Sequence, residues 1–166
     1  MVQKKIKTLR VFDTVGQEEY KDVRTLAYPD TEVLLIAFSI VKRDGFDNVK
    51  TVWIEEMKKY MRPLPKTVTC LSLDISFVHV YFKIILIGTK SDLKEDSKAL
   101  ELLAKESGPE AKPVTKGEGE ALAKEINAYG YYETSAKTAE GVKEVMDAAI
   151  EAVEGKEPGC SGCCFM

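Results

Sequence analysis

Residues 84–93 read IILIGTKSDL, a short apolar run that passes directly into a polar turn. A run that is apolar at successive positions is typical of a parallel strand covered on both faces, because its side chains are then buried whichever way they point. Residues 33–38, VLLIAF, have the same character. The two runs predict two buried parallel strands, and the polar residues 88–92 follow the carboxyl end of the second.

Helix-like segments separate these runs. Residues 46–60 carry apolar side chains at helical spacing, and Pro63 lies just beyond them. The charged segment 97–106 predicts a short amphipathic helix. Thr115 and Glu118 predict a capping box at the start of the next helix, because each side chain can bond the other residue's free backbone amide.

Two further strands and a last helix complete the prediction. Residues 6–12 (IKTLRVF) partly alternate between apolar and polar, and 131–134 form a short strand-like stretch. A final helix is predicted from an apolar stripe: Val142, Val145, Met146, Ala149 and Val153. This β-α-β-α order predicts an open α/β sheet.

Polar clusters follow three of the predicted strands: 13–17 (DTVGQ), 88–92 (GTKSD) and 134–137 (TSAK). In open α/β sheets, ligands bind beyond the carboxyl ends of the strands, so all three clusters are expected at one edge. Each cluster alone also fits a solvated turn or a helix cap. Their order and their common position at strand ends favour a shared ligand site.

Size and composition fit one soluble globular domain. The chain has 166 residues, 45% of them hydrophobic and 31% charged, and a net charge of −3. We expect no nucleic-acid binding, which a basic patch would indicate. The most apolar stretch, 67–88, contains Asp74, His79 and Lys83, so we expect no membrane span and no signal peptide.

Several stretches share a pattern with one known family: Tyr28–Thr31, Val33–Ile40, Phe46–Lys50, Trp53 and Thr89–Leu93. On these residues the chain resembles the Rho family of small GTPases. The resemblance implies a P-loop NTPase-type G domain, an α/β fold with an open, mostly parallel sheet and helices on both faces. It makes residues 1–154 a partial G domain, with a Rho-type insert region at 94–114 and an atypical insertion at 67–82.

The resemblance also implies a ligand and a role for particular residues. GTP or GDP would bind with Mg²⁺, which Asp13 would hold through water. The Gly16 amide would contact the γ-phosphate, and Gln17 would orient the attacking water as the catalytic residue. The guanine base would lie among Thr89, Lys90, Asp92, Leu93, Ser135, Ala136 and Lys137. Within that set Asp92 would accept from the base, Lys90 would cover its plane, and the Ala136 amide would donate to its O6 atom.

Two departures from the family pattern bear on activity. Val15 stands where the family usually has Ala, which adds bulk and stiffness to a segment that must move. No G-x-x-x-x-G-K-[ST] sequence occurs in the 166 residues, so the expected domain is incomplete at its N-terminus and its switch function is expected to be defective. The alternative is a nucleotide-free, membrane-tethered interaction protein or an inert truncated product.

The tail, residues 155–166, ends in Cys163-Cys-Phe-Met166, a C-a-a-X box that predicts prenylation of Cys163, with farnesyl favoured by the final Met. One lipid holds a protein only marginally, so Cys160 is the candidate for palmitoylation. Double geranylgeranylation of Cys163 and Cys164 is the alternative. We expect the cytoplasmic face of membranes with a cytosolic pool, a monomer, and the family's partners: exchange factors, GTPase-activating proteins, effectors and a dissociation inhibitor.

Overall fold

The structure is a computed structural model that describes residues 9–28, 31–60 and 83–154. Within them, β1 (Val33–Ser39), β2 (Lys83–Thr89) and β3 (Gly130–Thr134) form a parallel sheet in the order β1-β2-β3. The strands predicted from the apolar runs are confirmed, each slightly longer than predicted. The open, parallel α/β architecture is confirmed with them.

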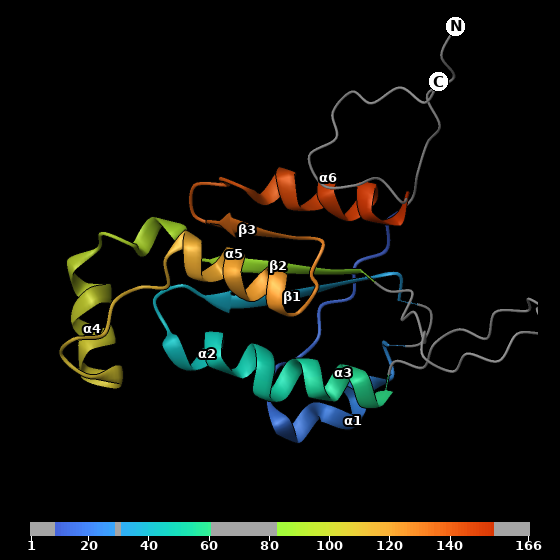
Figure 1. The fold of residues 1–166 in the computed structure, drawn as a ribbon, viewed down its shortest axis with the longest axis horizontal. Helices are drawn as coiled ribbons and strands as arrows, with labels where there is room; N and C mark the ends of the chain where they lie inside the picture. The colour runs from blue at the N-terminus through green and yellow to red at the C-terminus, as the bar shows by residue number, and fades with distance from the viewer. Residues whose placement is uncertain (1–8, 29–30, 61–82, 155–166) are drawn as a thin grey trace, which may run out of the picture.

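The register of the sheet brings the three carboxyl ends level. Ser39 pairs with Thr89, and Thr89 pairs with Thr134. Each strand therefore ends at the same edge, on the left of Figure 1, and whatever follows it begins there.

Helices cover both faces of the sheet (Figure 1). Ile85 and Ile87 of β2 face α6 (Val142–Val153), where they pack with Val145 and Ala149. The neighbouring Leu86 points the other way, into a second cluster. That cluster includes residues of the helical stretch 43–60 and of α5 (Lys116–Glu125). The period-2 alternation of a strand thus divides one buried run between two cores.

The predicted helix over 46–60 is confirmed but begins earlier, at Arg43. It consists of α2 (Arg43–Asn48), a π-helical segment η2 (Val49–Ile54) and α3 (Glu55–Tyr60). The remaining helical elements are η1 (Glu18–Tyr20), α1 (Lys21–Thr25), η3 (Ser91–Leu93) and α4 (Ser97–Ser107).

Local capping signals fix two helix starts. The Thr115 hydroxyl accepts from the Glu118 amide, and the Glu118 carboxylate accepts from the Thr115 amide, so the predicted capping box is present. The Asp96 carboxylate accepts from the Ala99 amide at 2.8 Å and begins α4 within the predicted insert region. These contacts satisfy backbone amides that have no partner inside the helix.

The strand predicted over 6–12 is wrong for its described part. Residues 9–12 form no strand and lie exposed, with Val11 at 59% and Phe12 at 70% exposure. A strand requires a neighbouring chain to accept and donate its backbone hydrogen bonds, and no described segment pairs with these residues. Residues 6–8, the 67–82 insertion and the 155–166 tail lie outside the described residues.

Candidate functional site

The chain leaves β2 through a turn that presents a carboxylate. Lys90 adopts the left-handed conformation with φ of 62°, and the single turn of η3 follows at once. The Leu93 amide donates to the Lys90 carbonyl at 3.0 Å and closes that turn. Asp92 therefore lies just beyond the end of β2, half-buried and held by the local backbone.

The loop after β3 reaches this carboxylate. The Ser135 hydroxyl donates to Oδ1 of Asp92 at 2.6 Å, and Ser135 is fully buried. The same hydroxyl accepts from the Thr138 amide at 3.2 Å. The Ser135 amide donates to the Glu140 carbonyl at 3.0 Å. The hydroxyl and the backbone amide of Ser135 are thus both hydrogen-bonded. Oδ2 of Asp92 makes no hydrogen bond with any described residue.

Gly141 closes the loop after β3. Its φ is +71°, and a Cβ atom built there would lie 2.0 Å from the Glu133 carbonyl oxygen. Only glycine fits so close to the strand with that backbone conformation. Glycine at position 141 therefore allows residues 135–140 to lie against the end of β3, beside the Asp92 turn.

Most of the residues predicted to surround a base come together here. Thr89 ends β2 and donates its hydroxyl to the Phe38 carbonyl at 3.0 Å. Lys90, Asp92 and Leu93 form the next turn, and Ser135 joins the two loops. Ala136 and Lys137 follow Ser135 and are exposed. The expectation that polar groups after neighbouring parallel strands meet at one edge therefore holds for the clusters after β2 and β3.

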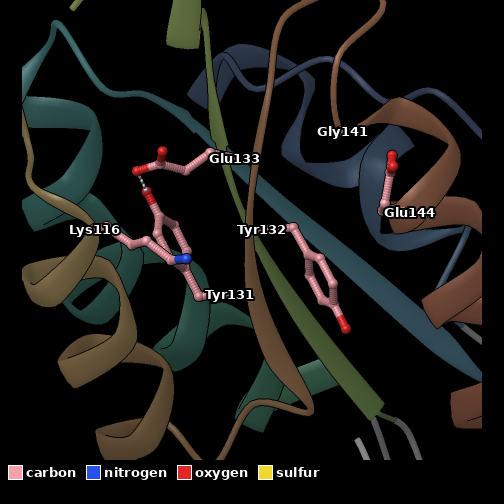
Figure 2. A pocket seen from close by; sticks show the side chains of 6 residues that line it. All are labelled: Lys116, Tyr131, Tyr132, Glu133, Gly141 and Glu144. Carbon is pink, nitrogen blue, oxygen red and sulfur yellow. Dashed lines mark hydrogen bonds between the residues drawn. The ribbon is translucent and has the colours of Figure 1, made fainter. Parts of the chain in front are cut away.

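A small cavity lies elsewhere, along β3. It measures about 230 Å³ and is lined by Lys116, Tyr131, Tyr132, Glu133, Gly141 and Glu144. Figure 2 shows Tyr131 and Tyr132 on opposite sides of the strand, with the Tyr131 hydroxyl donating to Glu133 at 3.1 Å. None of the predicted site residues lines it, so it is distinct from the Asp92 edge.

The third predicted cluster, 13–17, lies in an exposed segment rather than at a strand end. Asp13, Gly16 and Gln17 are all exposed, and none of their side chains bonds to Asp92 or Ser135 within the described residues. No group of three or more possible metal-ligating side chains occurs in the described parts of the chain.

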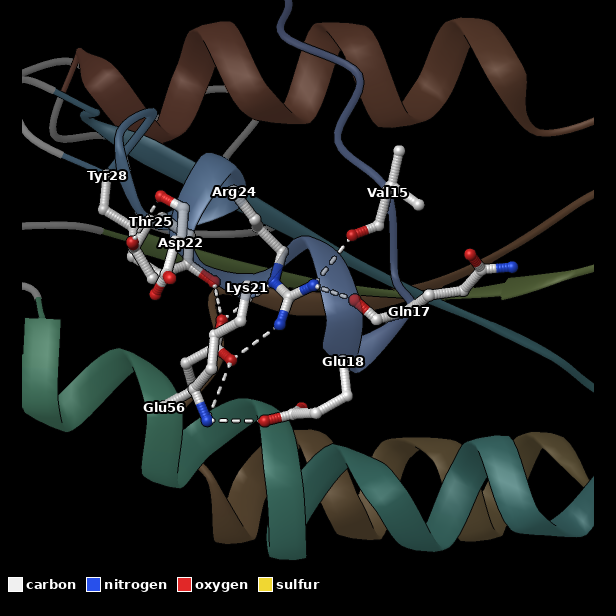
Figure 3. A network of polar contacts seen from close by, with 9 residues as sticks. All are labelled: Val15, Gln17, Glu18, Lys21, Asp22, Arg24, Thr25, Tyr28 and Glu56. Carbon is white, nitrogen blue, oxygen red and sulfur yellow. Dashed lines mark hydrogen bonds and ion pairs between the residues drawn. The ribbon is translucent and has the colours of Figure 1, made fainter.

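A buried ion pair that the sequence analysis did not single out holds this exposed segment (Figure 3). Arg24 in α1 donates from Nε and Nη2 to the two carboxylate oxygens of Glu56 in α3, at 2.9 and 2.7 Å. Its Nη1 donates to the carbonyls of Val15 and Gln17, at 2.7 and 3.0 Å. Only 4% of Arg24 and 5% of Glu56 is exposed.

The ion pair shifts the titration of its members. Hydrogen bonding to the Arg24 guanidinium holds the pKa of Glu56 below its ordinary value. Tyr28 also donates its hydroxyl to Glu56, and burial together with the nearby carboxylate raises the pKa of Tyr28 to about 12. One sequence signal could have revealed this cluster. Glu56 lies within the apolar stripe of the helix, between Trp53 and Tyr60, where a charge needs a buried partner.

Comparisons with known proteins give the family of the chain. Residues 1–155 match the model of the Ras family. The chain is 40% identical over 144 residues to "GTP-binding protein rho1" of Schizosaccharomyces pombe, covering 87% of this chain and 61% of that protein. It is 41% identical to "GTP-binding protein RHO1" of Saccharomyces cerevisiae, covering 87% of this chain and 59% of that protein.

The chain thus spans about three fifths of the length of these curated relatives. No helix in the described residues is both long enough and apolar enough to cross a membrane. The Ras family model matches almost the whole chain, and the two relatives of the Rho type are about 40% identical to it. The chain belongs to the Ras family, as a small GTPase of the Rho type.

Proposed function

We propose that this chain carries the guanine-recognition part of a Rho-type nucleotide switch, with the base bound at the edge formed by the ends of β2 and β3. The observation that supports the proposal is the hydrogen bond from Ser135 to Asp92, which joins the two loops and leaves one carboxylate oxygen available. In a chain of this family, such an edge is where a ligand is expected.

The chemistry of a carboxylate favours guanine over adenine at this edge. Guanine presents two neighbouring donors, its N1–H group and its exocyclic amine, and an ionised carboxylate is a pure acceptor. Adenine has an acceptor at N1 and no amine at C2, so it cannot present this pair of donors. Asp92 would therefore pair with guanine, while Lys90 would cover the base with its aliphatic stem and the Ala136 amide would donate to O6. Thr89, Leu93 and Lys137 would complete the surroundings.

The proposed roles at the phosphate end rest on the 13–17 segment. Gly16 would bring its amide close to the γ-phosphate, where a side chain would obstruct the approach. Gln17 would orient the attacking water. Asp13 would contribute one water-mediated contact to Mg²⁺, whose remaining ligands would be water and phosphate oxygens. The bound ion would offset the negative charge of the phosphates.

The strength of binding follows from the groups present in residues 1–166. The base site offers two or three charge-assisted hydrogen bonds at about 1.5–3 kcal/mol each. Association costs at least about 4 kcal/mol in lost freedom of motion. The balance is at best roughly −4 kcal/mol, which corresponds to a Kd no tighter than about 1 mM. Without a phosphate-cradling sequence in these residues, we propose that this polypeptide binds GTP or GDP weakly and hydrolyses GTP poorly.

A base-exchange titration tests the base site. Residues 1–166 are titrated with GMP, XMP and AMP while amide resonances of residues 89–93 and 135–137 are followed by NMR. GMP should bind at about millimolar Kd and AMP more weakly. Asp92→Asn should reverse the order of GMP and XMP, because an amide can donate to the O2 atom that xanthine carries in place of the amine. Equal affinity for GMP and AMP in the unsubstituted protein would refute the proposal.

The membrane and the regulators of the switch are further parts of the proposal. A C-terminal lipid on Cys163, with Cys160 as the second site, would hold the protein at the cytoplasmic face of membranes. Exchange factors, GTPase-activating proteins, effectors and a dissociation inhibitor would be its partners, as expected for a Rho-type protein. If no nucleotide binds in the titration, the nucleotide-free interaction protein becomes the better reading.

A further inference from the structure

One side chain, Arg24, bonds to the backbone on either side of Gly16, and the Gln17 carbonyl accepts in addition from the Tyr20 amide at 3.1 Å. Arg24 makes four hydrogen bonds, two to Glu56 and one each to the carbonyls of Val15 and Gln17. The two carbonyls belong to the residues immediately before and after Gly16. The segment is otherwise exposed, and Figure 3 shows the Gln17 side chain pointing away from this network.

The helical stretch 43–60 supplies a platform for this arginine. Its guanidinium carbon lies 4.9 Å from the centre of the Trp53 ring, in cation–π geometry. The same ring faces Gly16, where an added Cβ would stand 3.8 Å away. Trp53 belongs to the π-helical segment η2, directly before α3, which carries Glu56. A π-helical turn is rare and is often found at functional sites.

We propose that Arg24 is a positioning residue that fixes Gly16 and Gln17 for γ-phosphate sensing, and that Glu56 and Trp53 hold it in place. This inference rests on the proposed nucleotide switch, because Gly16 and Gln17 matter only if a nucleotide is bound. The coupling also gives helix α3 a physical connection to the 15–17 segment. A change at Glu56 or Trp53 reaches Gln17 through one guanidinium group.

A purely structural role predicts something different. If Arg24 only satisfied the buried Glu56 carboxylate, its Nη1 group would not need to reach two carbonyls in an exposed segment. Lysine separates the two roles, because an ammonium group is a single point charge and lacks the planar fork that reaches Glu56 and both carbonyls together. Arg24→Lys keeps the positive charge beside Glu56 and removes the planar group that bonds to Glu56 and both carbonyls at once.

The test measures backbone order in residues 1–166 without nucleotide. Backbone ¹⁵N order parameters of Gly16 and Gln17 and the carbonyl ¹³C shifts of Val15 and Gln17 are compared in the unsubstituted protein, Arg24→Lys and Glu56→Gln. The order parameters should fall from about 0.85 to below about 0.6 in both variants. The Val15 carbonyl shift should move upfield as its hydrogen bond is lost, and the Gln17 shift should move less, because that carbonyl keeps the Tyr20 amide as a donor.

Two controls separate positioning from general stability. Tyr28→Phe removes a buried hydroxyl that bonds to Glu56 but leaves Arg24 intact, so order at Gly16 and Gln17 should be unchanged. Arg43→Lys alters the contact between Arg43 of α2 and Glu118 of α5, and it should also leave the order at Gly16 and Gln17 unchanged. Amide exchange in β2 reports the fold as a whole.

Two results would overturn the inference. Unchanged order at Gly16 and Gln17 in Arg24→Lys would show that other contacts hold the segment. A loss of protection in β2 equal to that at Gly16 in every variant would show that Arg24 serves only the stability of the fold. Neither result depends on nucleotide binding. The GMP titration at Asp92 can therefore fail while this measurement succeeds, or the reverse.

Discussion

The Ser135 hydroxyl donates to the Asp92 carboxylate at 2.6 Å, across 43 residues of sequence. It ties the loop after β2 to the loop after β3, and the level strand ends make that contact possible. The bond orients the carboxylate before any ligand arrives, so ordering it adds little to the cost of binding. Ser135 can therefore affect the affinity of the proposed site through the orientation of Asp92.

Removal of that hydroxyl should destabilise the fold as well as the site. Ser135→Ala leaves the Thr138 amide without its acceptor and deprives Asp92 of a charge-assisted donor. Because Ser135 is fully buried, we expect a loss of roughly 1–3 kcal/mol in the free energy of unfolding, measured by urea denaturation. Thr51→Ala, at an exposed helical position, should change it by less than about 0.5 kcal/mol. A loss no larger in Ser135→Ala than in that control would contradict this account.

Substitution of two glycines of α5 by alanine should change the free energy of unfolding in opposite directions. A Cβ at Gly119 would lie 2.3 Å from the Tyr131 ring, whereas a Cβ at Gly117 would meet nothing within 4 Å. Gly117→Ala should therefore stabilise the protein by about 0.5–1 kcal/mol, the ordinary gain from replacing glycine in a helix.

At Gly119, steric overlap with Tyr131 determines whether alanine stabilises or destabilises the protein. Overpacking costs about 1–3 kcal/mol, which exceeds the helix-propensity gain, so Gly119→Ala should be net destabilising. Thermal or urea unfolding of the two single variants gives the comparison. Stabilisation by both substitutions would mean that Tyr131 moves aside at little cost.

The Arg43–Glu118 pair should make part of the stability depend on pH. Hydrogen bonding to Arg43, and then to the Thr115 amide, lowers the pKa of Glu118 from 4.5 to about 2. A lowered folded-state pKa stabilises the native state above pH 4.5, and that contribution disappears as the pH falls toward 2. The Glu118 side chain is 38% exposed, so solvent screening keeps the effect small.

Arg43→Ala isolates this contribution. The difference in urea midpoint between the unsubstituted protein and Arg43→Ala should be present at pH 6 and shrink steadily between pH 4.5 and pH 2. Lys143→Ala breaks an exposed pair with Asp147 and should show almost no difference at either pH. A difference that is the same at pH 6 and pH 2.5 would remove Glu118 as its cause.

Sequence patterns predicted the elements whose signals are local. The apolar runs at 33–38 and 84–87 predicted β1 and β2, because burial on both faces of a parallel strand favours an apolar residue at each position; β2 is buried in this way, whereas Ala37 of β1 is exposed. Thr115 and Glu118 gave a helix start because a capping box is complete within four residues. The meeting of the Asp92 and Ser135 loops followed from parallel strands alone, although the hydrogen bond itself did not.

The features that escaped prediction depend on contacts distant in sequence. Residues 9–12 alternate like a strand, but alternation does not supply the neighbouring chain that a strand needs. Arg24 and Glu56 are 32 residues apart, and only the position of a glutamate on an apolar stripe hinted at a partner. The π-helical segment 49–54 carries no sequence mark that separates it from an α-helix.

The C-terminal tail provides the last prediction, which rests on sequence because 155–166 lie outside the described residues. A farnesyl group on Cys163 contributes about 0.8 kcal/mol per buried CH₂ yet anchors a protein only reversibly. Stable residence at a membrane should need Cys160 as well. The acidic residues Glu151, Glu154 and Glu157 precede it and oppose anionic lipid by about 1 kcal/mol per charge near the surface.

The expected pattern of localisation is graded. With a fluorescent protein fused at the N-terminus, Cys163→Ser should be cytosolic, because prenylation normally precedes the second acylation. Cys160→Ser should distribute between internal membranes and cytosol, since a single chain binds marginally. Cys70→Ser, outside the tail, serves as the matched control and should localise like the unsubstituted protein. Retention at the membrane by Cys163→Ser would exclude the lipid anchor, and the exposed apolar residues Val11, Phe12 and Leu26 would then be the next surface to test.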